Sequence, residues 1–189
     1  MPFRDRKDAG KKLAVALACY KDARPVVLAL PRGGVPVAYE VATRLHAPLD
    51  VFLVRKLGVP GQTELAMGAI ASGGVEVLSE GLIRDLGIPS ALVQQTAARE
   101  RLELDRRDAL YRAGRPALSL GGRIVILVDD GLATGSTMHA AVLAVQRHQP
   151  ARVIVAVPVG AGETCARLER LADHLVCLRS EEHTSELQS

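Results

Sequence analysis

The sequence contains no tryptophan, and phenylalanine, tyrosine and tryptophan together make up only 3% of its 189 residues. Proteins that bind single-stranded nucleic acid stack the bases on aromatic side chains, and this chain has few to offer. Its net charge of +3 is too small to indicate a polyanionic partner by itself. The composition therefore argues against a nucleic-acid-binding protein.

Cysteine and long apolar runs are also scarce. The three cysteines, Cys19, Cys165 and Cys177, lie far apart and form no Cys-x-x-Cys pair. This spacing is not that of a disulfide framework or a zinc site. No apolar run approaches the length that spans a bilayer, and the first residues lack the apolar core of a signal peptide. These absences predict a cytoplasmic protein with no membrane partner.

The most informative stretch is an apolar run, residues 125–128, that leads directly into Asp129 and Asp130. Four consecutive apolar residues, mostly β-branched, predict a strand that is buried on both faces of a parallel sheet. Adjacent carboxylates at the end of such a strand repel each other and lose solvation unless a cation, a ligand or hydrogen-bond donors meet them. The acid pair therefore marks a candidate binding site.

The residues after the acids can supply those donors. Gly131 and Gly135 allow the backbone to turn its amides inward, and Thr134, Ser136 and Thr137 add hydroxyls at the start of a predicted helix. A helix amino terminus of this kind binds anions. Acids beside a phosphate loop fit a ribose 5-phosphate better than a nucleoside triphosphate, because the lysine of a Gly-Lys-Ser/Thr loop is missing. The alternative is a plain glycine-rich turn.

A second strand of the predicted sheet ends in a similar way. Residues 24–30 predict a buried strand, and Arg32, Gly33 and Gly34 follow it before another helix. A cation beside free backbone amides suits an oxyanion such as pyrophosphate. The alternative is that the two glycines only make a tight turn.

A third predicted strand, residues 49–54, ends in Arg55 and Lys56, and glycine and proline residues follow up to residue 62. This composition predicts a mobile basic lid, because glycines permit hinging and cations neutralise charge on a leaving group. A surface loop with incidental charge is the alternative.

The remaining pattern alternates strands and helices. We expect helices near residues 5–21, 89–111 and 164–171, strands at 152–159 and 174–178, and a hairpin over 67–78. This order predicts an α/β fold over residues 1–178, with a doubly wound, mainly parallel sheet flanked by helices and a small hairpin or lid insertion. Ligands of such sheets bind beyond the carboxyl ends of the strands, where all three candidate elements lie.

The tail, residues 179–189, has no apolar period and no predicted pairing partner. It resembles the translation of a common short-read sequencing adapter. We therefore expect this tail to be foreign to the protein and a natural C-terminal segment to be missing.

The acid pair and the turn Thr134-Gly135-Ser136-Thr137 resemble the 5-phosphoribosyl 1-pyrophosphate (PRPP) motif of type I phosphoribosyltransferases. Residues 30–37 and 64–71 resemble motifs shared by a bacterial group of phosphoribosyltransferase-domain proteins. The resemblance implies an enzyme of nucleotide metabolism, a glycosyltransferase that transfers the phosphoribosyl group from PRPP to a nitrogen acceptor and releases pyrophosphate. It also implies a Mg2+ cofactor and admits a homodimer.

The resemblance assigns a role to each candidate residue. Asp129 and Asp130 would hold the ribose 2- and 3-hydroxyls, directly or through waters of the Mg2+ ion. The ribose and 5-phosphate set comprises these two acids with Gly131, Leu132, Ala133, Thr134, Gly135, Ser136 and Thr137. The pyrophosphate set comprises Arg32, Gly33, Gly34, Arg55 and Lys56. The catalytic set comprises Arg55, Lys56, Asp129 and Asp130.

Ala133 bears on the acceptor. Hypoxanthine and guanine enzymes of the family carry an aspartate at this position, which argues against a 6-oxopurine acceptor here. The adenine branch also has alanine there, so adenine stays open as the acceptor. A different class of function stays open as well, a non-catalytic regulatory module that binds PRPP, although the Arg55 and Lys56 lid favours the enzyme.

Overall fold

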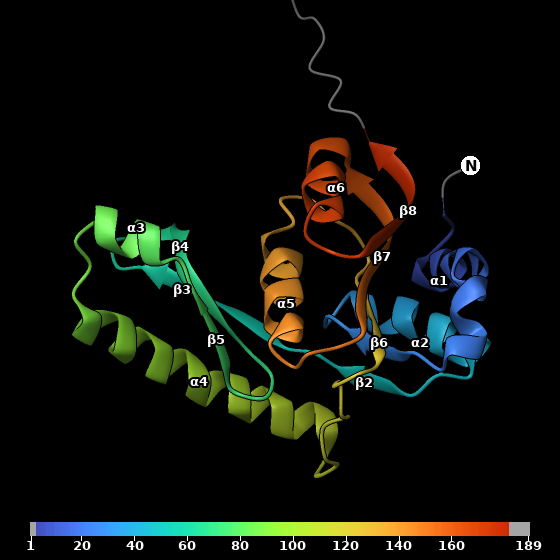
Figure 1. The fold of residues 1–189 in the computed structure, drawn as a ribbon, viewed down its shortest axis with the longest axis horizontal. Helices are drawn as coiled ribbons and strands as arrows, with labels where there is room; N and C mark the ends of the chain where they lie inside the picture. The colour runs from blue at the N-terminus through green and yellow to red at the C-terminus, as the bar shows by residue number, and fades with distance from the viewer. Residues whose placement is uncertain (1–2, 182–189) are drawn as a thin grey trace, which may run out of the picture.

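The computed structural model describes residues 3–181, apart from the side chains of residues 63, 64 and 181 (Figure 1). Its main sheet has five parallel strands in the order β2-β1-β6-β7-β8. The strands are β1 (Val26–Ala29), β2 (Leu49–Val51), β6 (Ile124–Val128), β7 (Arg152–Ala161) and β8 (His174–Glu181). The predicted α/β fold with a doubly wound parallel sheet is confirmed.

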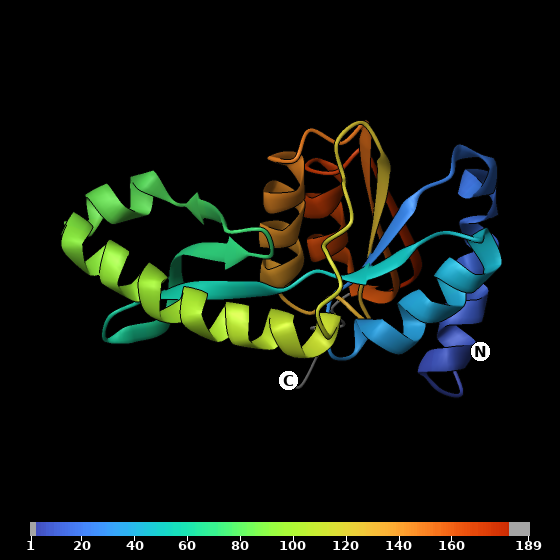
Figure 2. The ribbon, with the colours of Figure 1, turned by 90° about the horizontal axis from the view of Figure 1, so that it is seen from below.

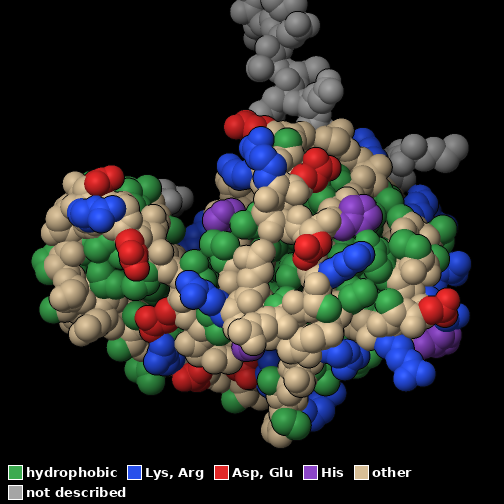
Figure 3. Space-filling view, in the orientation of Figure 1, with side chains coloured by type: hydrophobic (Ala, Val, Ile, Leu, Met, Phe, Trp, Pro, Cys, Tyr) green, Lys and Arg blue, Asp and Glu red, His purple; other side chains and the backbone are tan. Residues whose placement is uncertain are grey.

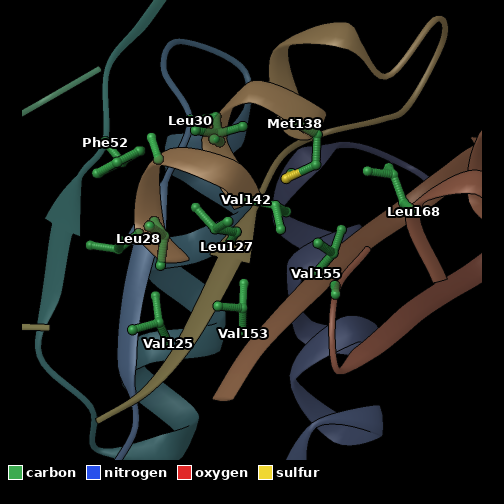
Figure 4. Packing of buried hydrophobic residues seen from close by; sticks show 14 of the residues in the cluster. Leu28, Leu30, Phe52, Val125, Leu127, Met138, Val142, Val153, Val155 and Leu168 are labelled. Atoms are coloured by element: carbon green, nitrogen blue, oxygen red, sulfur yellow. The ribbon is translucent and has the colours of Figure 1, made fainter. Parts of the chain in front are cut away.

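Helices cover both faces of this sheet. Helices α1 (Arg6–Ala16) and α2 (Gly34–Leu45) pack on one face, and α5 (Ser136–Gln146) and α6 (Gly162–Glu169) on the other. Figure 4 shows Leu127 of β6 and Val155 of β7 directed toward Val142 of α5. Ile126 of β6 points to the opposite cluster, with α1 and α2. Burial of alternate side chains on opposite faces explains why the central strands are continuously apolar.

A second sheet projects from the first with two further helices. Strands β3 (Val54–Val59), β4 (Gln62–Ala71) and β5 (Val75–Leu78) are antiparallel, and they pack with α3 (Glu80–Asp85) and α4 (Ser90–Arg112). We call these five elements the arm; it extends to one side of the parallel sheet in both views (Figures 1 and 2). The predicted hairpin is confirmed as β4 and β5, and the long charged helix as α4. Helix α3 had no clear sequence signal.

The arm contradicts one prediction. The expected strand 49–54 stops at Val51, and the expected mobile loop after it is strand β3, in which Arg55 pairs with Ile70 and Lys56 with Ala69 of β4. Only Pro60 and Gly61 form the turn between β3 and β4. The reason is that β4 supplies backbone partners for β3, while Leu57 is fully buried in the core of the arm.

A polar network joins α4 to the parallel sheet. The guanidinium of Arg112, at the end of α4, donates hydrogen bonds to Asp50 of β2 and, over 2.7 Å, to Asp108. It also donates to the carbonyl oxygen of Val51 over 3.2 Å. The Ser72 hydroxyl donates to Asp108 over 3.2 Å. Because Arg112 is buried, its charge depends on these two carboxylates.

Both ends of the described chain depart from expectation. The opening helix ends at Ala16, and a short 3-10 helix η1 (Ala18–Ala23) follows it. At the other end, strand β8 continues to Glu181, with Arg179 opposite Val159 and Ser180 opposite Gly160. The prediction that the tail has no pairing partner is therefore wrong for residues 179–181, since the long strand β7 offers a backbone template that needs no apolar period. Residues 182–189 lie outside the described residues.

None of the helices within residues 3–181 combines the length and the apolar character needed to cross a bilayer.

Candidate functional site

The ends of β1 and β6 bring the first two candidate elements together. These strands are neighbours, with Ala29 opposite Val128. Beyond them, the amide of Leu30 donates to the carbonyl oxygen of Val128 over 2.9 Å, which continues the pairing into the loop of residues 31–34. This 31–34 loop, which holds Arg32, therefore lies directly beside the acid pair.

Gly33 and Gly34 make that approach sterically feasible. A Cβ atom on Gly33 would lie 2.1 Å from Oδ2 of Asp130, and one on Gly34 would lie 2.6 Å from the carbonyl oxygen of Val128. The backbone dihedrals of Gly33, φ −61° and ψ −36°, are accessible to any residue. Space rather than conformation therefore favours glycine at position 33, because a Cβ there would displace the Asp130 carboxylate.

Asp129 sits in an environment that disfavours its charge. Burial raises the pKa of the Asp129 carboxyl to about 7, and the Asp130 carboxylate adds to the rise. The amide of Asp130 donates to Oδ1 of Asp129 over 2.8 Å, which lowers that pKa in part. The pKa of Asp129 therefore lies near neutral pH, and a bound cation would favour the ionised form of its carboxyl.

Asp130 has a cationic partner that sequence reasoning missed. Arg6, the first residue of α1, donates from Nε to Oδ2 of Asp130 over 2.8 Å, and its Nη2 lies 2.7 Å from the same oxygen. Helix α1 reaches the site because it packs closely on α2: a Cβ on Gly10 would lie 2.8 Å from the carbonyl oxygen of Val37. No sequence signal links Arg6 to Asp130, since 124 positions separate them.

The 131–137 loop forms a turn into α5. Gly135 caps the helix with φ +68°, a conformation that favours glycine. The hydroxyl oxygens of Thr134 and Ser136 lie 3.1 Å apart at this terminus. The first-turn amides of a helix have no acceptor within the helix. Hydroxyls and amides together therefore form a concentrated set of hydrogen-bond donors, as an anion requires.

Helix α6 donates hydrogen bonds to the backbone of this loop. The hydroxyl of Thr164 donates to the carbonyl oxygen of Ala133 over 2.8 Å, and Arg167 donates to that of Thr134. Leu132 forms a bridge with Gly160 at the end of β7. These contacts preorganise the loop, so that an anion would not have to order it on binding.

Arg55 and Lys56 occupy different surroundings. Arg55 donates from Nε to Glu100 of α4 over 2.7 Å, so its charge already has a partner. It also lines a small cavity with Arg32 and Thr137. The exposed Lys56 lines a larger cleft with the 131–137 loop. The structure therefore places Lys56 at one cleft with that loop, and Arg55, which Glu100 holds, at a separate cavity beside Arg32.

That cleft, about 670 Å³, separates the arm from α5 and is visible in Figure 3 as the notch between the two lobes. Besides Lys56, it is lined by Arg167 and His139, neither of which sequence reasoning selected. Burial and the charge of Arg167 lower the pKa of His139. His139 reaches the cleft from α5 and Arg167 from α6, and residue spacing alone does not reveal that these two positions meet.

The acid pair fits a magnesium ion held mainly through water and substrate. Within residues 3–181 no group of three or more His, Cys, Asp or Glu side chains is arranged to hold a metal. Magnesium commonly binds through one or two carboxylates, with waters and substrate phosphates completing its shell. Asp129, whose ionised form gains from a nearby cation, and Asp130 offer that donor set.

Comparison with known proteins agrees with this geometry. The family model described as "Phosphoribosyl transferase domain" matches residues 5–185. The chain is similar to the crystal structure of TT1426 from Thermus thermophilus, with 47% identity and a TM-score of 0.88 over 98% of this chain and 88% of that one. It is also similar in fold to the APRTase of Giardia lamblia complexed with 9-deazaadenine, with 16% identity and a TM-score of 0.54 over 94% of this chain and 80% of that one.

Two strains of Mycobacterium tuberculosis contain a relative that is provisionally named a phosphoribosyl transferase. It is 48% identical over 176 residues, which are 93% of this chain. The chain spans only 40% of the length of that relative.

Proposed function

The chain belongs to the phosphoribosyl transferase domain family, and from this premise we propose that it binds PRPP with Mg2+ and transfers the phosphoribosyl group to a nitrogen acceptor. Pyrophosphate is the leaving group. The observation that carries the proposal is the contact of Gly33 and Gly34 with the acid pair, beside a loop built to hold an anion. A sugar with a phosphate at each end matches that arrangement.

The acid pair would bind the ribose. Carboxylate oxygens accept hydrogen bonds from the 2- and 3-hydroxyls, and Asp129 accepts more strongly once it is ionised. When bound, Mg2+ would neutralise charge on the pyrophosphate, and Asp129 and Asp130 would hold the ion through its waters. The remaining binding rests on the residues of this chain.

The 131–137 loop would bind the 5-phosphate. The hydroxyls of Thr134, Ser136 and Thr137 and the first-turn amides of α5 are the donors for its oxygens. Thr164 and Arg167 hold the carbonyl oxygens of Ala133 and Thr134 in this loop before any ligand arrives, which lowers the entropic cost of binding.

Arg32, with its own amide and that of Gly33, would bind the pyrophosphate, and Lys56 would add charge from the arm. Breaking the bond between C1 and the pyrophosphate oxygen leaves negative charge on pyrophosphate and positive charge on the sugar. Cations fixed at the leaving group stabilise this transition state. Arg55 contacts Glu100 through Nε and Nη2, so it would contribute through its remaining donors in the cavity that it lines with Arg32.

The acceptor would be a nitrogen base that needs no aspartate at position 133 to exchange a proton with it. Ala133 offers only a methyl group there, and its carbonyl oxygen already accepts from Thr164. Adenine is therefore a better candidate than hypoxanthine or guanine.

A non-catalytic PRPP-binding regulatory module is the second candidate. Two observations favour it: Arg6 already occupies Asp130, and Glu100 holds Arg55. The two functions differ in turnover rather than in binding.

A turnover assay distinguishes them. Pyrophosphate release from Mg2+ and PRPP is measured with adenine and a panel of other nitrogen bases, for the parent and for the Asp129→Asn, Asp130→Asn double variant. A double variant of two exposed acids, Asp22→Asn with Asp85→Asn, is the control. If the chain is a transferase, the parent releases pyrophosphate with one of the bases, the Asp129→Asn, Asp130→Asn variant does not, and the control variant does. PRPP binding with no release by any base would favour the regulatory module.

A further inference from the structure

Arg6 is a cation at the acid pair that the proposed roles leave unused. Both of its contacting nitrogens, Nε and Nη2, meet Oδ2 of Asp130. The same oxygen would lie 2.1 Å from a Cβ on Gly33. Arg6 and the 31–34 loop therefore approach one carboxylate oxygen, which places the guanidinium at the junction of the acid pair and that loop.

The guanidinium keeps donors to spare. Arginine carries five N–H groups, and the contacts with Asp130 leave Nη1 without a role there. The Arg6 side chain is 61% exposed, so solvent or a ligand can reach these donors. Arginine forks of this kind bind phosphate oxygens while a neighbouring carboxylate orients them.

Charge gives Arg6 a purpose at this position. A pyrophosphate bound to the 31–34 loop would lie beside Asp130, and two anions in contact repel each other. A guanidinium on Oδ2 removes that repulsion and adds an attraction. Arg4, two residues earlier, is also an exposed arginine, but it pairs with Asp8 of α1 and not with the acid pair.

We infer that Arg6 is a pyrophosphate-binding residue of the site, oriented by Asp130 and acting together with the 31–34 loop. This inference rests on the proposed function, because it assumes that PRPP is the ligand. It predicts a contribution to the binding of PRPP that is absent from the binding of ribose 5-phosphate, which has no pyrophosphate.

Calorimetric titration of PRPP and of ribose 5-phosphate, each with Mg2+, tests the assignment. The proteins are the parent, Arg6→Gln, Arg6→Lys, and Arg4→Gln as a control that removes the same charge from the same segment. We expect Arg6→Gln to bind PRPP about tenfold more weakly, the loss of one charge-assisted hydrogen bond, and to bind ribose 5-phosphate as the parent does. Arg6→Lys recovers part of the loss, and Arg4→Gln loses nothing.

Three results would overturn the inference. Equal PRPP affinity in Arg6→Gln and the parent means that Arg6 does not contact the ligand. An equal loss for both ligands means that Arg6 only supports the shape of the site. If the parent binds ribose 5-phosphate but not PRPP, or neither ligand, the proposed function fails first and the inference falls with it.

Discussion

Replacement of Gly33 by alanine tests whether the Asp130 carboxylate must lie where the structure has it. The backbone at Gly33 accepts alanine without strain, so the only conflict is the new Cβ, 2.1 Å from Oδ2 and 2.3 Å from Cγ of Asp130. Such distances are far shorter than van der Waals contact, so the carboxylate has to rotate away. That rotation breaks the pair with Arg6 and removes an acceptor from the ribose.

The effect on stability should be small and the effect on binding large. The Arg6 pair is partly exposed and contributes about 0–1 kcal/mol to stability, which corresponds to a fall in melting temperature of about 2–4 °C at most. Loss of a charged hydrogen-bond partner for the ligand costs about 1.5–3 kcal/mol, or at least about tenfold in PRPP affinity.

Calorimetry with PRPP and Mg2+ measures the affinity, and thermal unfolding measures the stability. Gly81→Ala is the matched control, because nothing lies within 4 Å of a Cβ at that helical position. We expect the control to bind PRPP as the parent does and to melt at the same or a slightly higher temperature. Parent-like PRPP affinity in Gly33→Ala would mean that the ligand does not need the Asp130 carboxylate at this position.

Two further predictions concern charge. Because the pKa of Asp129 is raised to about 7 in the folded state, the folded protein holds a proton that the unfolded chain releases near pH 4. The free energy of unfolding of the parent should therefore fall relative to that of Asp129→Asn as the pH rises from 4 to 8. Parallel curves of unfolding free energy against pH would contradict the raised pKa. Arg112→Ala leaves Asp50 and Asp108 without their cation and should lower the free energy of unfolding by about 3–5 kcal/mol, measured by chemical denaturation. Arg106→Ala, on the exposed face of α4, is the control and should leave the denaturation midpoint unchanged. Equal midpoints for the two variants would contradict a stabilising role of the Arg112 network.

The parallel sheet was predictable because its strands are buried on both faces. Ile126 and Leu127 must both be apolar when helices pack on each side, so periodicity and composition agree. The meeting of the 31–34 loop with Asp129 and Asp130 also follows from elementary topology, since parallel strands end at one edge.

The arm and the cationic partners were not predictable in the same way. Strand β3 exists because β4 pairs with it: of the glycines that indicated a mobile loop, Gly58 is accommodated in that pairing and Gly61 forms the turn after it. Arg6 reaches Asp130, 124 positions away, because α1 packs on α2, and Arg167 reaches the carbonyl oxygen of Thr134, 33 positions away, from α6. The hydrophobic period of a helix predicts which of its faces is buried, but not which polar residue at its end contacts the site.

The most direct test of a PRPP site at this sheet edge is calorimetric titration of PRPP with Mg2+ into the parent and the Asp129→Asn, Asp130→Asn variant. We expect saturable binding by the parent and loss of that binding in the variant. The melting temperature of the variant should stay close to that of the parent, because removal of two crowded acids offsets loss of the exposed Arg6 pair. Equal binding by both proteins would place the PRPP site elsewhere, and no binding by a folded parent would mean that this sheet edge is not a PRPP site.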